Sequence, residues 1–113
     1  MREAFAHEAL VELAPGSDER AVGGAITVAL CGHWEHEGPC MWPHHTSVQP
    51  SGSATLVRTV FACPAQDEPE VRRRLRLAIA SGSLESSTWT VRQDGSTSVR
   101  ESEADLAIRL ARG

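Results

Sequence analysis

Six of the eight cysteine and histidine side chains in this sequence fall within fifteen residues, in the stretch CGHWEHEGPCMWPHH. They are Cys31, His33, His36, Cys40, His44 and His45. Thiolates and imidazoles are the side chains that bind zinc and other borderline-to-soft transition metals. The density of these donors predicts a metal site, with zinc as the expected ion and copper or nickel as alternatives.

The spacing of the donors, C-x-H-x2-H-x3-C-x3-H-H, offers more ligands than one ion requires. A structural zinc ion takes four ligands in a tetrahedral arrangement, at distances of about 2.0–2.3 Å. The expected ligands are His33, His36, Cys40 and His44. Cys31 is the leading substitute, and His45 is an alternative to its neighbour, because adjacent residues rarely serve one ion equally well. A closed site, an open site and a pair of ions are all compatible with this number of donors.

The spacing does not fit the familiar zinc motifs. The residues from His36 onward read HEGPC rather than H-E-x-x-H, which excludes the helical metalloprotease arrangement. The H-x-E…P-C-x-x-C pattern of zinc deaminases also fails, because its two halves would be nearly fused and Pro43 stands where the second cysteine belongs. A paired C-x2-C zinc ribbon is absent. The motif therefore assigns no family.

Length and composition indicate one ordinary globular domain spanning residues 1–113. The apolar fraction is 41% and the charged fraction is 23%, as in typical globular domains. The net charge of −4 argues against a dedicated nucleic-acid binder, which normally carries a basic face. The basic run from Arg72 to Arg76 is expected to be a solvated helix face, with Glu68 paired to Arg72 four residues away.

The chain also lacks the signs of a membrane or secreted protein. No apolar run approaches the roughly 18 residues that a membrane span needs. The stretch MREAFAHEALVELAPG has no basic region followed by an apolar one, so it does not resemble a secretory signal. Three irregularly spaced cysteines favour reduced thiols over a disulfide framework. We therefore expect a cytoplasmic location.

The clearest predicted strands are residues 25–34 and 54–63, which are rich in β-branched side chains. Cys31 and His33 would share one face at the end of the first strand. Residues 35–53 between the strands contain several prolines and glycines and show no periodicity. A structureless loop of this length is usually functional or disordered, and we interpret it as the Cys/His-rich metal-binding loop.

Two helices are predicted at residues 67–81 and 102–113, each with a capping residue, and the first also has an apolar stripe. Strands at 86–92 and 97–101 would form a hairpin around Asp94-Gly95. Weaker signals suggest a short strand or a helical turn at 8–13 and a brief helix at 18–22 that ends at Gly23-Gly24. The predicted class is α+β, a small mainly antiparallel sheet of four to five strands with two helices on one face, in the order (β)-β-long loop-β-α-β-β-α.

Cys63 is left out of the predicted site on topological grounds. If residues 25–34 and 54–63 pair as antiparallel neighbours, Cys63 lies about 20 Å from Cys31, at about 3.3 Å per residue. A parallel pairing would bring the two cysteines together, but it needs a crossover helix that the loop does not predict.

Four functions follow from these observations. The first is a small metal-binding protein in which the ion orders the loop and serves a structural, partner-binding or regulatory role. The second is an enzyme with an open zinc site and Glu35 or Glu37 as general base. The third is metal handling, and the fourth is a metal-free protein-protein interaction module. We favour the first, a non-enzymatic protein whose partner is another protein or a second copy of itself.

Overall fold

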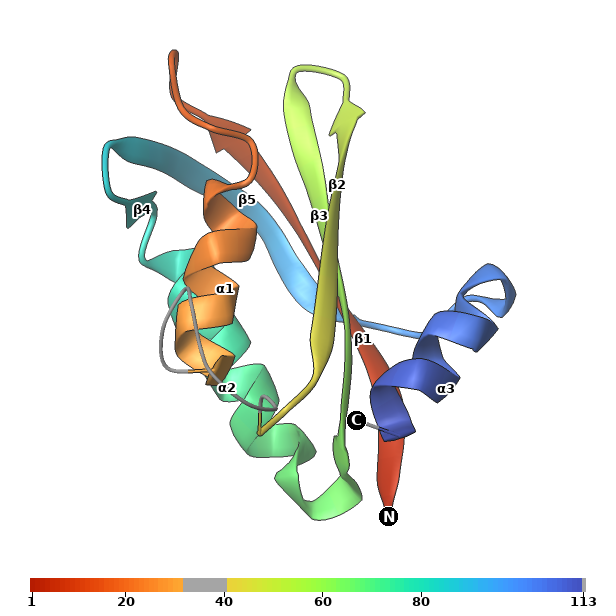
Figure 1. Cartoon of the computed structure of the whole chain (residues 1–113). Coiled ribbons are helices and arrows are strands. Elements are labelled where there is room, and N and C mark those ends of the chain that lie inside the picture. The colour runs from red at the N-terminus through yellow and green to blue at the C-terminus, as the bar shows by residue number, and fades with distance from the viewer. Residues whose placement is uncertain (32–40, 113) are drawn as a thin grey trace.

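Five strands form one antiparallel sheet whose spatial order differs from their order along the chain. The structure is a computed structural model that describes residues 1–31 and 41–112. Its elements are β1 (Arg2–Leu13), α1 (Ala21–Cys31), β2 (His44–Ser51), β3 (Ala54–Pro64), α2 (Glu68–Ala80), β4 (Ser83–Leu84), β5 (Ser87–Thr97) and α3 (Ala104–Arg112). The strands are ordered β2-β3-β1-β5-β4 across the sheet. Figure 1 shows α1 and α2 on one face and α3 on the other.

The connections follow a regular pattern. The segment β1-α1-β2 joins two strands that flank β3, and the segment from β3 through α2 to β5 joins two strands that flank β1. This is the split β-α-β arrangement of ferredoxin-like topology. The α+β class and the antiparallel sheet are therefore confirmed. The predicted element order is wrong in its first half, where α1 stands between β1 and β2, and the two predicted helices, α2 and α3, lie on opposite faces of the sheet rather than on one.

The core lies between the sheet and the α1–α2 pair. Alternate residues of the two central strands face it, among them Val11 of β1 and Phe61 of β3, both 0% exposed. The helices contribute residues one turn apart, such as Ile26 from α1 and Leu75 from α2. In the antiparallel register, Phe5 lies opposite Phe61 and Ala9 lies opposite Val57. The core-facing residues of β1 therefore lie beside the core-facing residues of β3, as the two-residue period of strands requires.

The predicted strand at 25–34 is wrong, because residues 21–31 form helix α1. Val22, Ile26 and Leu30 are spaced four residues apart and are all buried, yet the other positions are apolar as well. A helix covered on several sides gives a continuous apolar run, which periodicity alone does not distinguish from a buried strand. Cys31 is accordingly the last residue of a helix and does not lie on a strand.

The brief helix predicted at 18–22 is also wrong, since Gly23-Gly24 lies inside α1 rather than after a helix. Gly23 brings the helix close to the sheet, because a Cβ added there would lie 3.4 Å from the Thr46 methyl carbon of β2. This glycine therefore serves close packing rather than helix termination.

The loop predicted at 35–53 is wrong where the structure describes it, because residues 44–51 form β2 and pair with β3. The strand predicted at 54–63 is confirmed as β3, but its hairpin partner is β2. The hairpin predicted around Asp94-Gly95 is also wrong, because both residues lie within the continuous strand β5. The twelve-residue strand β1 provides β5 with a partner along this length. The helices predicted at 67–81 and 102–113 are confirmed as α2 and α3.

None of the helices in residues 1–31 and 41–112 combines the length and the apolarity needed to cross a bilayer.

The turn after α2 yields a stability prediction. Gly82 has φ +71°, and a Cβ there would lie 3.1 Å from the Trp89 carbonyl oxygen. Gly16 has φ +82° but has open space around it. A left-handed non-glycine residue costs roughly 1–2 kcal/mol, so Gly16→Ala should lower the free energy of unfolding by about that amount. Gly82→Ala should cost more because it adds the backbone contact, and equal losses in urea denaturation would contradict this account.

Candidate metal site and surrounding polar networks

The structure brings two of the predicted ligands together. Cys31 ends α1 and His44 begins β2, and the Cys31 sulfur lies 3.9 Å from His44 Nδ1. Three other predicted ligands, His33, His36 and Cys40, lie outside the described residues, as do the candidate bases Glu35 and Glu37. Among residues 1–31 and 41–112, no group of three or more cysteine, histidine or acidic side chains is placed to hold a metal.

The oxidation state of Cys31 differs from expectation. Its sulfur is disulfide-bonded in this structure, whereas the sequence favoured reduced thiols. A metal ligand must be a thiolate, so Cys31 can ligate only after reduction. The redox state of this cysteine therefore decides whether it is available to an ion.

The imidazole of His44 is held between α1 and β2. Its Nε2 lies 3.2 Å from Thr27 Oγ1, and its Nδ1 lies 3.2 Å from the Trp42 carbonyl oxygen. The Thr27 hydroxyl in turn lies 3.0 Å from the Gly23 carbonyl oxygen, to which it donates. These contacts orient the ring so that Nδ1 is the nitrogen nearest the Cys31 sulfur.

The two adjacent histidines lie on opposite faces of β2. His44 is half-buried on the helix side, and His45 is exposed on the other side. Strand side chains alternate between faces, so His45 does not substitute geometrically for His44. A hollow of about 320 Å³ lies beside His44, between α1 and β2, and includes Gly23, Gly24 and Thr27 in its lining.

Trp42 packs at the start of this region. It is 6% exposed, and its indole N–H donates to Asp67 Oδ2 at 3.3 Å. The Arg74 guanidinium lies 4.7 Å from the Trp42 ring centre. These contacts fix the segment before β2 against the N-terminal part of α2, which supports a packing role for this tryptophan.

Cys63 is a free and fully buried thiol on β3. Burial, with Asp67 and Glu68 nearby, raises its pKa to about 11. The side chain therefore stays protonated at neutral pH and is not a ready metal ligand. The topological reason for leaving Cys63 out of the predicted site does not apply, since residues 25–31 belong to helix α1.

A second polar group, centred on His7, was not predicted. His7 Nε2 lies 2.5 Å from Asp94 Oδ1, and Arg72 Nη1 lies 3.1 Å from Nδ1. Arg72 also donates to the Ala6 carbonyl oxygen at 2.9 Å and to Glu68 at 2.7 Å. With one ring nitrogen donating to Asp94 and the other accepting from Arg72, His7 is neutral. Neither nitrogen is left for a substrate, so this Asp–His pair joins β1, β5 and α2 structurally.

The His7 network predicts a pH dependence. Burial lowers the pKa of His7 below its ordinary 6.5, assisted by Arg72 and Arg76 and opposed by Asp94. The unfolded chain therefore binds this proton more readily, and the stability from neutral His7 should be lost as pH falls below 6.5. His7→Gln should flatten the pH dependence of unfolding in that window.

An unchanged slope in His7→Gln would contradict this assignment of the titrating group.

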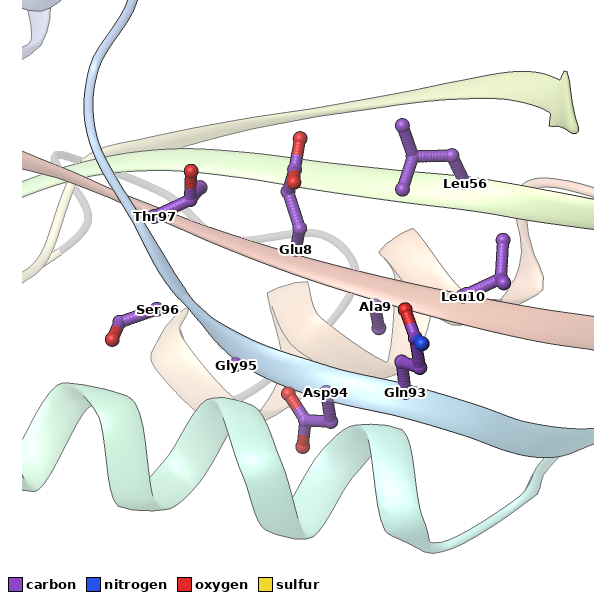
Figure 2. Close-up of a pocket in the computed structure, with 9 residues that line it drawn as sticks. All are labelled: Glu8, Ala9, Leu10, Leu56, Gln93, Asp94, Gly95, Ser96 and Thr97. Atoms are coloured by element: carbon purple, nitrogen blue, oxygen red, sulfur yellow. The ribbon is translucent and has the colours of Figure 1, made fainter.

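The face of the sheet opposite α1 and α2 carries a shallow hollow of about 290 Å³. Figure 2 shows its lining on β1, β3 and β5, including Glu8, Leu10, Leu56 and Gln93. Gly95 also lines it, and a Cβ at Gly95 would meet nothing within 4 Å. The hollow is open and mixed in polarity, and both of its acidic groups are already paired, Glu8 with Arg58 and Arg100 and Asp94 with His7.

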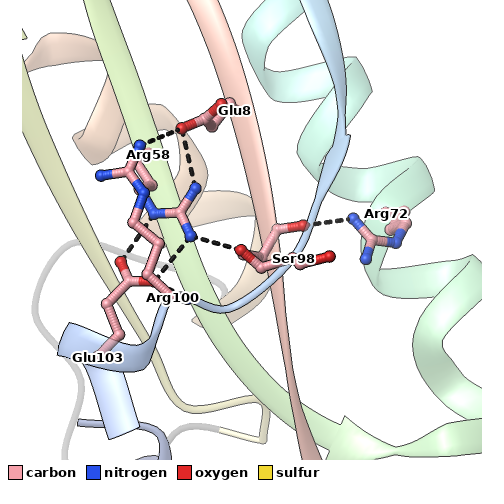
Figure 3. A network of polar contacts seen from close by, with 7 residues as sticks. Glu8, Arg58, Arg72, Ser98, Arg100 and Glu103 are labelled. Carbon is pink, nitrogen blue, oxygen red and sulfur yellow. Dashed lines mark hydrogen bonds and ion pairs between the residues drawn. The ribbon is translucent and has the colours of Figure 1, made fainter.

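That ion-pair network anchors α3. Arg58 donates to both oxygens of Glu103 at 2.7 Å, to Glu8 at 2.8 Å and to the Ser98 carbonyl oxygen at 2.7 Å (Figure 3). The Arg58 side chain is only 5% exposed. The hydrogen bonds from Arg58, with the Arg100 backbone N–H, lower the pKa of Glu103 to about 2. The network joins the sheet to the start of the C-terminal helix.

The Cys31 sulfur and the positioned imidazole of His44 are thus two candidate donors to a transition metal. The polar groups of the His7 and Arg58 networks, in contrast, are hydrogen-bonded to one another. Comparisons of this chain with protein-family models, with curated proteins and with solved structures found no significant match.

Proposed function

We propose that the protein binds a transition-metal ion, zinc in the first place, where the end of α1 meets the start of β2. The observation that carries this proposal is the 3.9 Å separation between the Cys31 sulfur and His44 Nδ1. These residues are thirteen positions apart in a donor-rich stretch, and they come from different elements. His33, His36 and Cys40 are the further ligands that the sequence offers.

The surroundings of His44 support this assignment. Thr27 Oγ1 lies beside Nε2, and ligating histidines commonly use their second nitrogen to bond a neighbouring group that fixes the ring. Binding an ion through Nδ1 would move the imidazole proton to Nε2, which would then donate to Thr27 Oγ1. Cysteine ligands bind as thiolates, so metal binding to the reduced protein should release their thiol protons.

The role that we propose for the ion is structural, regulatory or partner-binding. Of the two described candidate ligands, Cys31 belongs to α1, which packs on one face of the sheet, and His44 belongs to β2, the edge strand. An ion there would tie the helix to the edge of the sheet. Reduction of Cys31 would be required for its participation, so metal binding and disulfide formation at this residue would exclude each other.

The decisive measurement is zinc stoichiometry of protein purified under reducing conditions, by elemental analysis and native mass spectrometry. His44→Ala should lose zinc or weaken its binding at least tenfold, in line with the loss of one ligand. His45→Ala is the matched control, because that histidine faces away from the site. Cys40→Ser should also lose zinc, and parallel titrations with copper and nickel would identify a different preferred ion.

The proposal would be wrong if the reduced protein bound none of these ions and its melting temperature ignored a chelator. It would also be wrong if His44→Ala retained the zinc occupancy and affinity of the wild type. Oxidised protein should bind less zinc than reduced protein, because Cys31 is then unavailable.

A further inference from the structure

The second half of β5 is weakly held. Residues 92–96 are all exposed, and none of the residues of α3, which follows, is buried. On the outer side of β5, β4 pairs only with Ser87 and Thr88, and no other strand of the described chain lies there (Figure 1). Segments with few buried contacts open at a lower free energy than the core. Residues 92–97 can therefore leave β1 at a lower cost than the central strands can separate.

A β-bulge separates the two halves of β5. Leu10 lies opposite Gln93, whereas Val11 lies opposite Val91, so Arg92 is an extra residue in this strand. A bulge of this kind shifts the alternation of backbone directions by one residue. Arg92 is therefore the point at which β5 changes its phase relative to β1.

The backbone directions before the bulge follow from one hydrogen bond. The Trp89 N–H donates to the Gly82 carbonyl oxygen at 2.9 Å, on the outer side of β5. Because the directions alternate along a strand, Val91 also directs its backbone groups outward. Without the bulge, Gln93 would direct its groups outward as well.

An outward-facing Gln93 is what a hairpin at Asp94-Gly95 requires. Asp-Gly is a preferred loop of two-residue type I′ hairpins. In such a hairpin the residues that flank the loop, Gln93 and Ser96, exchange both of their backbone hydrogen bonds. The returning strand would place Ser98 opposite Val91, on the outer side of β5. The bulge-free phase of β5 thus agrees with the local turn signal, and the observed phase opposes it.

Two polar contacts hold β5 in its observed form. His7 Nε2 lies 2.5 Å from Asp94 Oδ1, and Figure 2 shows the Asp94 side chain directed toward α2. Arg58 donates to the Ser98 carbonyl oxygen at 2.7 Å, and the same guanidinium binds Glu103 directly before α3 (Figure 3). A hairpin would break these contacts, because residues 94–98 would no longer lie beside β1.

We propose that residues 94–112 form a two-state element. In the closed state, which is the one observed, β5 continues along β1 and α3 covers the sheet. In the open state, residues 96–99 fold back along residues 90–93, and α3 leaves the sheet. The pairs from Ala6↔Thr97 to Ala9↔Asp94 are exchanged for as many pairs within the hairpin. The two packings therefore lie close in free energy, and the polar contacts and the packing of α3 favour the closed state.

The open state uncovers an apolar patch. Ala6, Val60 and Ala62 are at most 2% exposed, but they do not belong to the core between the sheet and the α1–α2 pair. They lie on the opposite face, where α3 contacts β1 and β3. Release of α3 changes the surface that the protein presents, so the hairpin controls access to this face.

A disulfide trap distinguishes the two states. In the hairpin, Val91 and Ser98 form a hydrogen-bonded pair with Cα atoms about 5.5 Å apart, within the range of about 4.4–6.8 Å for disulfides. In the observed strand they are about 23 Å apart, at about 3.3 Å per residue. Val91→Cys combined with Ser98→Cys should therefore form an intramolecular disulfide in oxidised glutathione under native conditions. Mass spectrometry of proteolytic peptides would identify this linkage.

Thr88→Cys combined with Ser96→Cys is the matched control. These two residues have a similar separation along the chain, but in the hairpin they lie about 16 Å apart along the strands. Only unfolded protein would link them, so the control pair should form its disulfide at least tenfold more slowly.

Two further substitutions test the turn and the contact that opposes it. In the observed strand Gly95 has no positive φ, and a Cβ there would meet nothing within 4 Å. A type I′ turn requires a positive φ at this position, which valine disfavours. Gly95→Val should therefore keep the fold and slow the trapping at least tenfold. Asp94→Asn suits the turn equally well but removes the charge that binds His7, so it should speed the trapping about tenfold.

The proposal would be overturned if the disulfide between positions 91 and 98 formed no faster than that of the control pair. An unchanged rate in Gly95→Val would also overturn it, because the turn would then not lie at Asp94-Gly95. An unchanged rate in Asp94→Asn would overturn the role of the His7 contact. None of these substitutions involves Cys31 or His44, so the outcome is separate from that of the zinc measurement.

Discussion

Replacing Arg58 by methionine should lower the free energy of unfolding by about 3–5 kcal/mol, the usual cost of removing one partner from a buried ion pair. The Arg58 side chain is 5% exposed, and it donates to Glu103, Glu8 and the Ser98 carbonyl oxygen. Methionine fills much of the same volume but leaves two carboxylates on the same face without their shared cation. Urea denaturation of both proteins at neutral pH would measure the difference.

Arg92→Met is the matched control for the loss of charge. Arg92 lies on β5 of the same sheet and pairs with Glu12, but its side chain is 54% exposed. Exposed ion pairs contribute at most about 1 kcal/mol, so this variant should change stability little. Similar losses in the two variants would show that burial of Arg58 is not what makes its network important.

The same network should control stability in acid. The pKa of Glu103 is about 2 in the folded protein, below its ordinary 4.5. The carboxylate therefore stabilises the fold above pH 4.5, and this contribution should be lost as pH falls from there toward 2. The hydrogen bonds from Arg58 are the main cause of the lowered pKa of Glu103. The variant without Arg58 should therefore lose stability less steeply as pH falls from 4.5 toward 2.

The anchoring matters because α3 is held by few buried contacts. None of its residues is buried, although Leu106 and Leu110 are half-buried against the sheet. The Arg58 network holds the turn directly before α3 through Glu103, whose carboxylate also accepts the Arg100 backbone N–H at 2.8 Å. A variant without Arg58 is therefore expected to loosen α3 before the rest of the fold.

Local sequence signals correctly predicted those elements whose residue pattern is compatible with only one type of secondary structure. α2 has acidic residues in its first turn and an apolar stripe of Val71, Leu75 and Ile79, and the structure has this helix and this stripe. α1 was misassigned because its run AVGGAITVALC is apolar on nearly every side. Such a run is consistent with a buried strand as well as with a buried helix, so only packing against the sheet and α2 decides between them.

The polar sites were harder to predict because they join residues that are distant along the chain. His7 and Asp94 are separated by 87 positions, and Asp94-Gly95 carried a strong local turn signal. β1 is long enough to pair with β5 through this dipeptide, and the pairing outweighs the local turn signal. The chemistry of the Cys/His stretch was readable in the sequence, but the meeting of Cys31 with His44 depends on α1 and the β2–β3 hairpin.

Replacing Phe61 by alanine should cost about 3–5 kcal/mol, the usual range for a fully buried phenylalanine. Phe61 is 0% exposed, and its ring centre lies 5.6 Å from that of Phe5. The Arg72 guanidinium lies 5.3 Å from the Phe61 ring, so the change also removes a cation–π contact. Chemical denaturation would measure the loss, and Phe61→Leu should recover a large part of it.

Phe5→Ala is the control, because Phe5 is only half-buried while belonging to the same ring pair. Its smaller expected loss separates the cavity in the core from the loss of the ring contact itself. Phe61 also lies opposite His44 in the β2–β3 register. If His44 binds an ion, folded Phe61→Leu protein should bind zinc more weakly than wild type, because the packing that supports the imidazole has changed. If the two alanine variants were equally stable, the full burial of Phe61 would not explain the cost of removing its ring.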